Sequence, residues 1–404
     1  MKRTDVIVLG GGIIGAAIAE ELARHGQRVV LLERGRIGAE ASSAAAGILS
    51  AQMDLPTPGP FFELCQAARR MYPRWVEHLQ RRAGMSVHYH VDGILYLAMT
   101  GREEHAMERQ LRWQVKQGLR VARWSRQDVR RHEPNVDGRV KRGFHFPTEA
   151  QVDNVLLMQA LERACRKAGV ELHERTTVRR VLVRAKTVQG VETDHGELRA
   201  PVLINCLGSW AALDGKFPVA VPVSPARGQM LAFHGPKGLF RHAVMSERAY
   251  VVQRRDGRLI VGSTVEFAGF DKRLTLQGIH GILCGLRQFS SAVNACPLVE
   301  MWAGFRPCAV DQLPIIGKTA IGGLFLATGH FRHGILLAPI TAALLTELIL
   351  RGRTSFDLTP FAPSRFTPPH GSPARQGGEE GVLIPKGSSP KPRPSGRGAG
   401  FTKP

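Results

Sequence analysis

The sequence predicts an α/β protein in which a discontinuous Rossmann-type domain is interleaved with a β-rich antiparallel domain. The segment from Asp5 to Glu33 reads as a strand, a glycine-rich turn, a helix and a second strand. The middle of the chain contains short strands separated by turn signals such as Asp256-Gly257. Near its end the chain returns to a strand, a glycine turn and an apolar helix in "GLFLATGHFRHGILLAPITAALLTELILRG".

The first element is a βαβ unit whose glycines follow the pattern G-x-G-x-x-G. In this pattern Gly10 permits the tight turn, Gly12 lets the backbone approach a pyrophosphate, and Gly15 lets the helix approach the strand. The amino terminus of the helix then faces the phosphates. Glu33 closes the second strand, where its carboxylate can accept hydrogen bonds from both hydroxyls of an adenosine ribose. These features in register predict dinucleotide binding.

A second loop, "GRIGAEASSAAAGILSAQ", follows the βαβ unit and is rich in small residues. Ser42, Ser43 and Gly47 lie in this loop, and they would let the backbone come close to a flat ligand and hydrogen-bond to it. A nicotinamide cofactor has less need of such a loop, whereas FAD has a longer body to cover. The loop therefore favours FAD, and the alternative is a solvated alanine and serine linker.

The remaining pattern alternates helices with strands. Amphipathic helices are predicted over residues 61–82 and 102–117, strands between them in "VHYHVDGILYLAM", and a further helix in "QVDNVLLMQALERACRKAGVEL". A buried strand, "VLINCLG", ends in Gly208, where a cofactor can pass. We therefore assign residues 1–85, 148–215 and 318–355 to a Rossmann-type FAD-binding domain, and residues 86–147 and 216–317 to an antiparallel substrate domain.

The composition is that of a soluble globular protein, with 404 residues, 43% of them hydrophobic and 22% charged. The six cysteines show no CxxC or Cys/His spacing, so no metal site is expected. We find no signal peptide, and no run of about 18 apolar residues that would predict a membrane span. A cytoplasmic location is expected.

The formal net charge of +21 raises the question of a nucleic-acid partner. The basic residues are spread along the whole chain in pairs such as Arg69-Arg70 and Arg179-Arg180, rather than concentrated on one element. This distribution favours a solvated basic surface and argues against nucleic acid as a partner. Residues 362–404 are basic and rich in Pro, Gly and Ser, which predicts a disordered tail.

The closing segment "FLATGHFRHGILLAP" places Arg332 where an apolar pattern asks for a hydrophobic residue. An unpaired buried charge is costly, so Arg332 should either turn toward water or meet a partner that the chain itself does not visibly supply. The second option would make it a ligand contact.

These segments together resemble the FAD-dependent amine and D-amino-acid oxidase superfamily, and within it the glycine oxidases of thiamine biosynthesis. The resemblance is carried by the βαβ start, "EASSAAAGIL", the triplet "RGQ" at Arg227 to Gln229, "WAGFRPCAVDQLPIIG" and "GHFRHGILLAP", and it covers about residues 4–355.

The resemblance implies that FAD is bound by the glycine turn, the small-residue loop and the GHFRHGI turn. With the glycine pattern, the expected cofactor-binding residues are Gly10, Gly12, Ile13, Ile14, Gly15, Glu33, Arg34, Ser42, Ser43, Ala45, Gly47, Ile48, Val178, Gly208, Gly329, His330, Arg332, His333, Gly334 and Ile335. The closing helix would direct its amino terminus at the flavin ring. Cys308 does not align with the cysteine that tethers flavin in sarcosine oxidases, so the FAD is expected to be non-covalent.

The resemblance also implies catalytic residues. Arg306 and Arg332 are candidates to hold the substrate carboxylate, since a guanidinium can pair with a carboxylate in two charge-assisted hydrogen bonds. Tyr250 matches the family tyrosine that hydrogen-bonds this carboxylate. A surface ion pair is the alternative for each arginine. We interpret His330 and His333 as turn residues satisfied by the backbone rather than as catalytic bases.

The activity implied is oxidative deamination of glycine, sarcosine and small D-amino acids. The alpha carbon would deliver a hydride to flavin N5, giving imine or oxo acid, ammonia and, after reaction with oxygen, hydrogen peroxide. Glycine imine would serve thiamine thiazole synthesis. Val265 replaces a methionine that lines the substrate pocket in some members, which leaves the preferred amine open.

Two alternatives stay open at this point. One is a D-amino-acid dehydrogenase of the same fold that passes electrons to a carrier. The other is an FAD oxidase acting on tRNA wobble uridine, which the net charge motivates. Whether the protein forms a homo-oligomer is also left open by the sequence.

Overall fold

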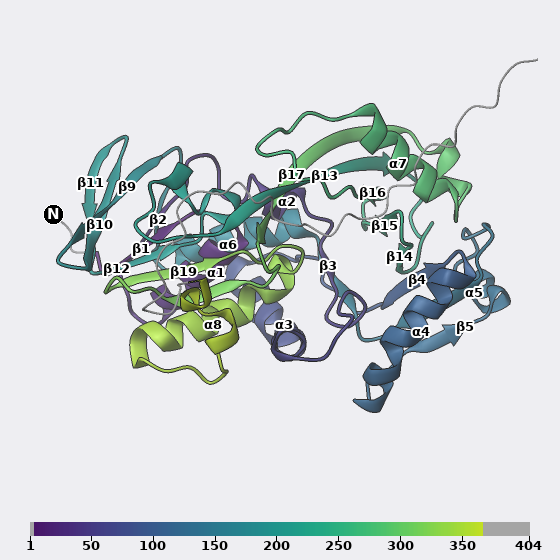
Figure 1. The fold of residues 1–404 in the computed structure, drawn as a ribbon. Coiled ribbons are helices and arrows are strands. Elements are labelled where there is room, and N and C mark those ends of the chain that lie inside the picture. The colour runs from purple at the N-terminus through teal and green to yellow at the C-terminus, as the bar shows by residue number, and fades with distance from the viewer. Residues whose placement is uncertain (1–3, 367–404) are drawn as a thin grey trace, which may run out of the picture. The chain divides into compact units, whose positions relative to one another are not determined.

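The amino-terminal βαβ unit forms as predicted, with strand β1 (Val6–Leu9), helix α1 (Ile13–Arg24) and strand β2 (Val29–Leu32). The computed structural model describes residues 4–366 (Figure 1). Every residue of β1 and β2 is buried, as expected of parallel strands covered on both faces. This unit positions the glycine turn at the carboxyl end of β1.

The six-stranded sheet around β1 has the strand order β18-β19-β12-β1-β2-β8. Its other strands are β8 (Glu171–His173), β12 (Val202–Asn205), β18 (Ile315–Lys318) and β19 (Leu324–Thr328). All neighbours are parallel except β18, which runs antiparallel to β19. The chain therefore returns to this sheet several times, and segments that are far apart in the sequence become neighbouring strands.

Helices α6 (Asn154–Lys167) and α8 (Gly334–Arg351) contact the sheet and α1, and helix α3 (Pro60–Ala83) packs on α6 and α8. Their boundaries have local causes. Pro60 occupies the first turn of α3, and Gly84 ends it with φ +68°. Asp153 caps α6 by accepting hydrogen bonds from the amides of Val155 and Leu156.

Helix α8 differs from the expectation that the chain contains no apolar run long enough to span a membrane. It has 18 residues with a mean hydropathy of 1.7, so by length and composition it is long and apolar enough to cross a membrane. Within the protein, however, 61% of these residues are buried. The helix packs against α1 and α3, which is the arrangement of an internal core helix.

The second large sheet has eight strands in the order β17-β13-β16-β15-β14-β4-β6-β5. The strands are β4 (Ile94–Ala98), β5 (Ala122–Trp124), β6 (Arg142–Phe146), β13 (Val223–His234), β14 (Ala243–Met245), β15 (Tyr250–Gln253), β16 (Arg258–Gly262) and β17 (Leu298–Ala309). The predicted antiparallel sheet is wrong at one pairing, because β14 and β4 run parallel. β14 and β4 are far apart in the sequence, and their parallel pairing joins the two parts of the sheet.

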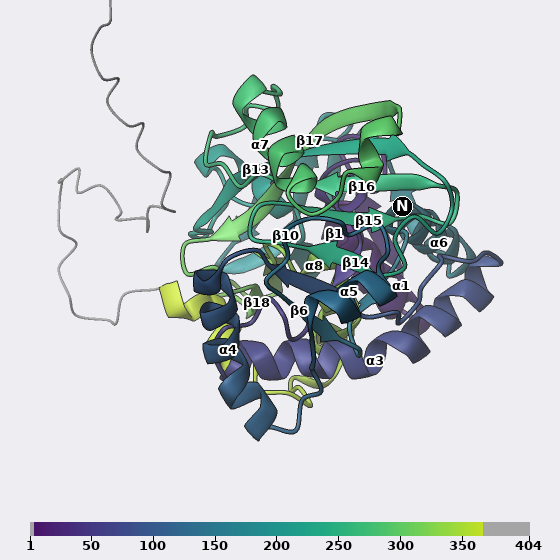
Figure 2. The same cartoon turned by 90° about the vertical axis from the view of Figure 1, so that its right-hand side faces the viewer.

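The remaining elements are short or peripheral (Figure 2). They are α2 (Ala41–Ala44), β3 (Ile48–Leu49), α4 (Gly101–Lys116), α5 (Arg126–His132), β7 (Ala150–Gln151), β9 (Val178–Arg184), β10 (Thr187–Thr193), β11 (Gly196–Arg199) and α7 (Leu276–Arg287). The predicted helices over residues 61–82 and 102–117 correspond to α3 and α4.

The predicted domain boundaries and tail stand differently. All described residues fall in one compact unit, so the division into FAD-binding and substrate segments stays a prediction. Part of the expected tail is ordered: Pro363–Phe366 forms a 3-10 turn, and Arg365 pairs with Asp311 at 2.8 Å. Residues 367–404 lie outside the described residues.

Candidate active site

A cavity of about 510 Å³ lies where the two large sheets meet. Its volume is in the range of small-molecule and cofactor sites, about 300–1,000 Å³. The glycine turn and Glu33 line it, and so do Tyr250, Arg306 and Arg332. The cavity therefore joins the dinucleotide-type turn to the arginines that we expect to bind a carboxylate.

Most of the residues predicted for the site line this cavity. They are Gly10, Gly12, Ile13, Ile14, Glu33, Arg34, Ser42, Ala45, Gly47, Ile48, Gly208, Tyr250, Arg306, His330, Arg332, His333, Gly334 and Ile335. Four predicted residues do not line it: Gly15, Ser43, Val178 and Gly329. Gly15 and Ser43 support lining segments, as described below, whereas Val178 is buried in β9.

The glycine turn has the geometry that its sequence predicts. Gly10 has φ +99°, and a Cβ at this position would lie 2.5 Å from the carbonyl oxygen of Cys206. A Cβ on Gly15 would lie 2.0 Å from the carbonyl oxygen of Gly10, so only glycine lets α1 approach β1 this closely. A Cβ on Gly12 would meet only the Ser42 hydroxyl, at 3.3 Å.

Glu33 organises the turn as well as lining the cavity. One carboxylate oxygen accepts a hydrogen bond from the amide of Gly11 at 2.8 Å, and the other accepts one from the amide of Gly35 at 2.8 Å. A carboxylate has about four acceptor positions, so positions remain for ribose hydroxyls. Ser42 acts similarly at the helix, where its hydroxyl accepts a hydrogen bond from the amide of Ile13 at 2.9 Å.

The small-residue loop is packed rather than solvated, so the linker alternative is wrong. The Asn154 side-chain amide donates hydrogen bonds to the carbonyls of Ser42 and Ser43 at 2.8 and 2.9 Å. A Cβ on Gly47 would lie 2.0 Å from the carbonyl of Val152. Gly47 and the small residues beside it thus allow close packing of the backbone, and they also leave room for a ligand.

Arg254 is a supporting residue that the sequence did not reveal. Its guanidinium is buried and donates to the carbonyl of Val152 at 2.8 Å, the carbonyl of Ala46 at 2.9 Å and the side-chain oxygen of Asn154 at 2.7 Å. Burial lowers the pKa of Arg254, and the nearby Asp153 opposes this shift. Arg254 therefore ties β15 to the loop that lines the cavity. No local sequence signal marks it.

A second set of contacts that the sequence did not reveal lies around Arg34, at the cavity wall. The Arg34 guanidinium lies 3.7 Å from the ring centroid of Trp210, and Phe270 stacks on the same Trp210 with centroids 5.0 Å apart. The Lys272 ammonium pairs with Glu40 at 2.6 Å. Phe270 and Lys272, which follow β16, therefore contact residues beside the predicted FAD site.

Arg306 lies in β17 and is held in place by hydrogen bonds. One terminal nitrogen donates to the carbonyl of Thr264 at 3.1 Å, and the other donates to the Ser263 hydroxyl at 2.6 Å. A Cβ on Gly228 would lie 2.3 Å from the guanidinium, so the glycine provides the space for it. Burial lowers the pKa of Arg306, which Tyr250 opposes. No carboxylate in the described chain pairs with Arg306, so the ion-pair alternative is wrong.

Arg332 differs from Arg306 because its side chain is exposed. Of the two options that the sequence left open, the structure shows the first: the chain turns this charge toward solvent, at the cavity wall. Its guanidinium carbon lies 5.1 Å from the centroid of the Phe331 ring. Within residues 4–366 no acidic side chain lies in ion-pair distance of it. The tyrosine of the predicted trio, Tyr250, places its hydroxyl 3.3 Å from the sulfur of Met230.

The two histidines of the closing turn are buried. His330 shares a hydrogen bond of 3.1 Å between its Nε2 and the Thr341 hydroxyl, so its partner is a side chain and not the backbone. Burial lowers the pKa of His330 to about 3. Burial also lowers the pKa of His333; Asp54 opposes this shift, and Arg332 adds to it. Both imidazoles are therefore neutral at neutral pH.

The residues at the site fit a flavin dinucleotide on structural grounds. His333 Nε2 is a buried polar atom with no hydrogen-bond partner among the described residues, and it lies at the cavity wall. The cavity extends continuously from the glycine turn to the amino terminus of α8, where Gly334, Ile335 and Leu336 line it. Gly10, Glu33 and Ser42 would hold the adenosine and pyrophosphate end, and residues 330–336 the ring end.

Comparisons with known proteins show the family of the chain. The model of the family DAO, FAD dependent oxidoreductase, matches residues 5–348. The bifunctional protein ThiO/ThiG of Synechocystis sp. is 36% identical over 369 residues, which cover 90% of this chain and 54% of that protein. The glycine oxidase of Geobacillus kaustophilus is 33% identical over 368 residues, which cover 90% of this chain and 97% of that enzyme.

A solved structure extends the likeness to the fold. The crystal structure of glycine oxidase from Geobacillus kaustophilus matches with a TM-score of 0.86 at 32% identity, covering 90% of this chain and 98% of that chain. This chain spans about half the length of the ThiO/ThiG relatives that it matches. Because the family match takes in both large sheets and the whole cavity, the chain belongs to the DAO family of FAD-dependent oxidoreductases.

Proposed function

We propose that this protein oxidises glycine and related small amines, such as sarcosine and small D-amino acids, and that its imine product serves the thiazole branch of thiamine biosynthesis. The observation that carries the proposal is the pair of guanidiniums, Arg306 and Arg332, in the wall of the same cavity that the glycine turn lines. Relatives named glycine oxidase and ThiO/ThiG support the choice of glycine.

The arginines would bind the substrate carboxylate. A guanidinium has five N–H donors, and hydrogen bonds to Thr264 and Ser263 occupy two of those of Arg306. The others are available to a carboxylate, together with the donors of Arg332. Two charges at one end of the cavity fix the orientation of an amino acid as well as its affinity.

The walls beside the arginines would select small side chains. Met53, Tyr96, Met245 and Tyr250 line this part of the cavity. Burial raises the pKa of Tyr96 to about 12, so its hydroxyl is protonated at neutral pH and can donate a hydrogen bond. Apolar walls of this kind exclude water from the substrate and leave little room beyond its alpha carbon.

Bound FAD supplies the acceptor for the two electrons that leave the amine. The residues of the chain contribute binding, alignment and exclusion of water, since none of the described side chains at the carboxylate end forms a nucleophile and base pair. His330 and His333 stay uncharged at neutral pH, so they add no repulsion to a substrate amine.

An anaerobic visible spectrum of the purified protein tests this proposal. Glycine, sarcosine and D-alanine are added separately, and each sample is then exposed to air while hydrogen peroxide is measured. Fastest bleaching by glycine, with recovery in air and peroxide release, is expected. Bleaching without peroxide would instead favour a dehydrogenase that uses another electron acceptor, and a flavin that none of the amines bleaches would contradict the proposal.

A further inference from the structure

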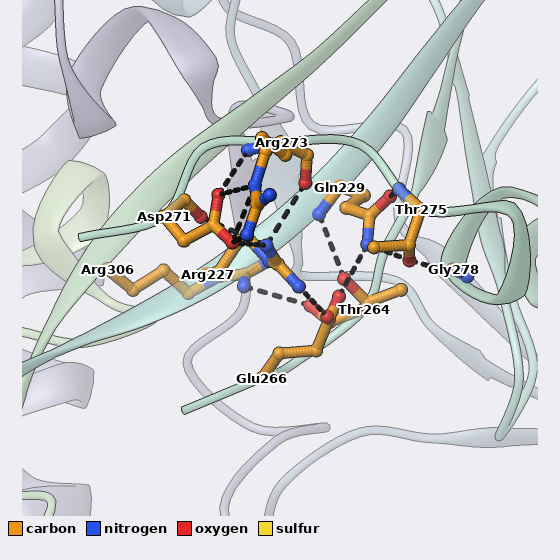
Figure 3. Close-up of polar contacts among 9 residues, drawn as sticks. All are labelled: Arg227, Gln229, Thr264, Glu266, Asp271, Arg273, Thr275, Gly278 and Arg306. Atoms are coloured by element: carbon orange, nitrogen blue, oxygen red, sulfur yellow. Dashed lines mark hydrogen bonds and ion pairs between the residues drawn. The ribbon is translucent and has the colours of Figure 1, made fainter. Parts of the chain in front are cut away.

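The triplet Arg227, Gly228 and Gln229 in β13 has no role in the proposed chemistry, although its side chains are unusually well connected (Figure 3). Arg227 is 5% exposed and Gln229 is fully buried. All their side-chain partners lie in residues 263–275, the connection between β16 and α7, which we call the β16–α7 segment. The buried guanidinium of Arg227 and the buried amide of Gln229 thus make all their side-chain hydrogen bonds to the β16–α7 segment.

Arg227 holds this segment at three places. One terminal nitrogen donates to the carbonyls of Asp271 and Arg273, each at 3.0 Å, and the other forms a short ion pair with Glu266. The backbones of Arg227 and Glu266 also exchange hydrogen bonds of 2.8 and 2.9 Å, so the two residues are fixed side by side.

Gln229 makes a second attachment. Its side-chain amide donates to the Glu266 carboxylate at 2.8 Å and to the Thr275 hydroxyl at 3.0 Å, and its oxygen accepts from the Thr275 amide at 2.9 Å. A Cβ on Gly278 would lie 2.3 Å from this amide, so the first turn of α7 is shaped around it. The backbone amide of Gln229 donates to the Thr264 hydroxyl at 2.9 Å.

Thr264 connects this network to the candidate active site. The Thr264 hydroxyl accepts a hydrogen bond from the Gln229 amide, and the Thr264 carbonyl accepts one from Arg306 (Figure 3). The adjacent Ser263 hydroxyl accepts the other hydrogen bond from Arg306. Gly228 lies between Arg227 and Gln229 and gives the Arg306 guanidinium its space. The same short segment of β13 therefore leaves space for the Arg306 guanidinium and also holds the β16–α7 segment, whose residues orient that guanidinium.

We infer that Arg227, Gln229 and Glu266 are positioning residues that fix the β16–α7 segment, so that Ser263 and Thr264 hold Arg306 ready to bind a substrate carboxylate. The inference rests on the proposed function for the identity of the substrate, but not for the existence of a carboxylate site. A guanidinium that is already held loses little rotamer freedom when it binds, so loosening its anchors should weaken carboxylate binding selectively.

The experiment measures the binding of acetate and of its neutral analogue acetamide to the holoenzyme by titration calorimetry. Variants Glu266→Gln and Arg227→Lys weaken the anchor, and Thr264→Val removes only the hydroxyl that Gln229 holds, which makes it a milder second test. The control is Arg273→Gln, because the Arg273 side chain is 86% exposed and pairs only with Asp271 at the surface, whereas its contact with Arg227 is made by its backbone carbonyl.

The anchor variants should raise the Kd of acetate about tenfold, the size of one lost charge-assisted hydrogen bond, and leave the Kd of acetamide and the FAD content unchanged. With an active wild-type enzyme, the KM for glycine should rise while kcat stays within about twofold, as for lost uniform binding. Arg273→Gln should match the wild type in every measurement.

The outcomes separate the two proposals. Equal loss of acetate and acetamide binding, or unchanged acetate binding in Glu266→Gln and Thr264→Val, would overturn the positioning role and leave only a structural one. Wild-type protein that binds acetate no better than acetamide would overturn it as well. If selective acetate binding depends on the anchor but glycine fails to bleach the flavin, the positioning role stands and the proposed function fails.

Discussion

Arg332 and Arg306 line the same end of the cavity but are held in different ways. Arg306 is half-buried and oriented by Ser263 and Thr264, whereas Arg332 is exposed and contacts Phe331. An exposed side chain loses more freedom on binding than a held one. In the proposed carboxylate site, Arg306 would therefore fix the orientation of the substrate, and Arg332 would bind the carboxylate from the solvent side.

Replacing Arg332 by alanine should raise the KM for glycine by about tenfold or more, since at least one charge-assisted hydrogen bond is lost. FAD content should stay at the wild-type level. Steady-state kinetics and the flavin absorbance of the same preparation check both points. Arg332→Lys keeps the charge and should recover part of the loss, and an unchanged KM in Arg332→Ala would remove this residue from the carboxylate site.

Glu149 gives a pH prediction at the same scale. Burial raises the pKa of this fully buried carboxyl from 4.5 to about 8, although it accepts a hydrogen bond from the amide of Ala51. Between these values the folded protein binds a proton that the unfolded chain releases, so folding stability falls as pH rises. His330 and His333 act in the opposite sense, but only below their ordinary value of 6.5.

Between pH 6.5 and 8 the wild type should therefore lose stability relative to Glu149→Gln, by up to about 1.4 kcal/mol per pH unit. Denaturant unfolding of both proteins at several pH values checks the difference in slope. The exposed Glu77, changed to glutamine, serves as the control and should leave the slope as in the wild type. Parallel curves for Glu149→Gln and wild type would show that Glu149 is ionised in the folded protein.

At the scale of elements, the loop from Ser42 to Gly47 is held by residues that lie far from it in sequence. Arg254, directly after β15, and Asn154 on α6 bind its carbonyls, and β3 and β7 pair beside it. The loop is therefore preformed, and its shape does not depend on the ligand that it covers.

Replacing Arg254 by methionine should weaken FAD binding and lower the free energy of unfolding. Three buried acceptors lose their partner, and each unpaired group costs about 1–3 kcal/mol, less any relaxation. FAD titration of the protein and denaturant unfolding measure the two effects. The neighbouring Arg255 is exposed, so Arg255→Met is the matched control. Equal FAD affinity in both variants would contradict the role of Arg254.

At the scale of the whole molecule, the cavity is lined by both large sheets, so the ligand contacts segments from nearly the full described length. A ligand that binds only the folded protein stabilises it by mass action. The holoenzyme should therefore be more stable than the protein freed of FAD, by about 2.7 kcal/mol at a free FAD concentration of about 100 times the Kd.

Differential scanning calorimetry at several FAD concentrations checks this. The Tm should rise with FAD, and both sheets should unfold in one transition because they share the ligand. Two transitions, of which FAD shifts only one, would show that the second sheet unfolds independently of the cofactor site. Such a result would also support the predicted division of the chain into FAD-binding and substrate segments.

By itself, the sequence determined the features that depend on neighbouring residues. The βαβ unit, its glycine turn, the helices α3 and α4 and the strand and helix around residues 324–351 follow from periodicity, caps and glycine positions. The family motifs, which are also local, predicted FAD, and most of the site residues that they predicted do line the cavity.

Only the tertiary structure decided which side chains meet. The parallel pairing of β14 with β4, the solvent exposure of Arg332 and the anchoring by Arg254 each depend on segments that are distant in the chain. The same holds for Arg227, whose partner Glu266 is brought beside it by the pairing of strands. Burial and hydrogen-bond partners belong to the folded arrangement, whereas periodicity and turn chemistry belong to the local sequence.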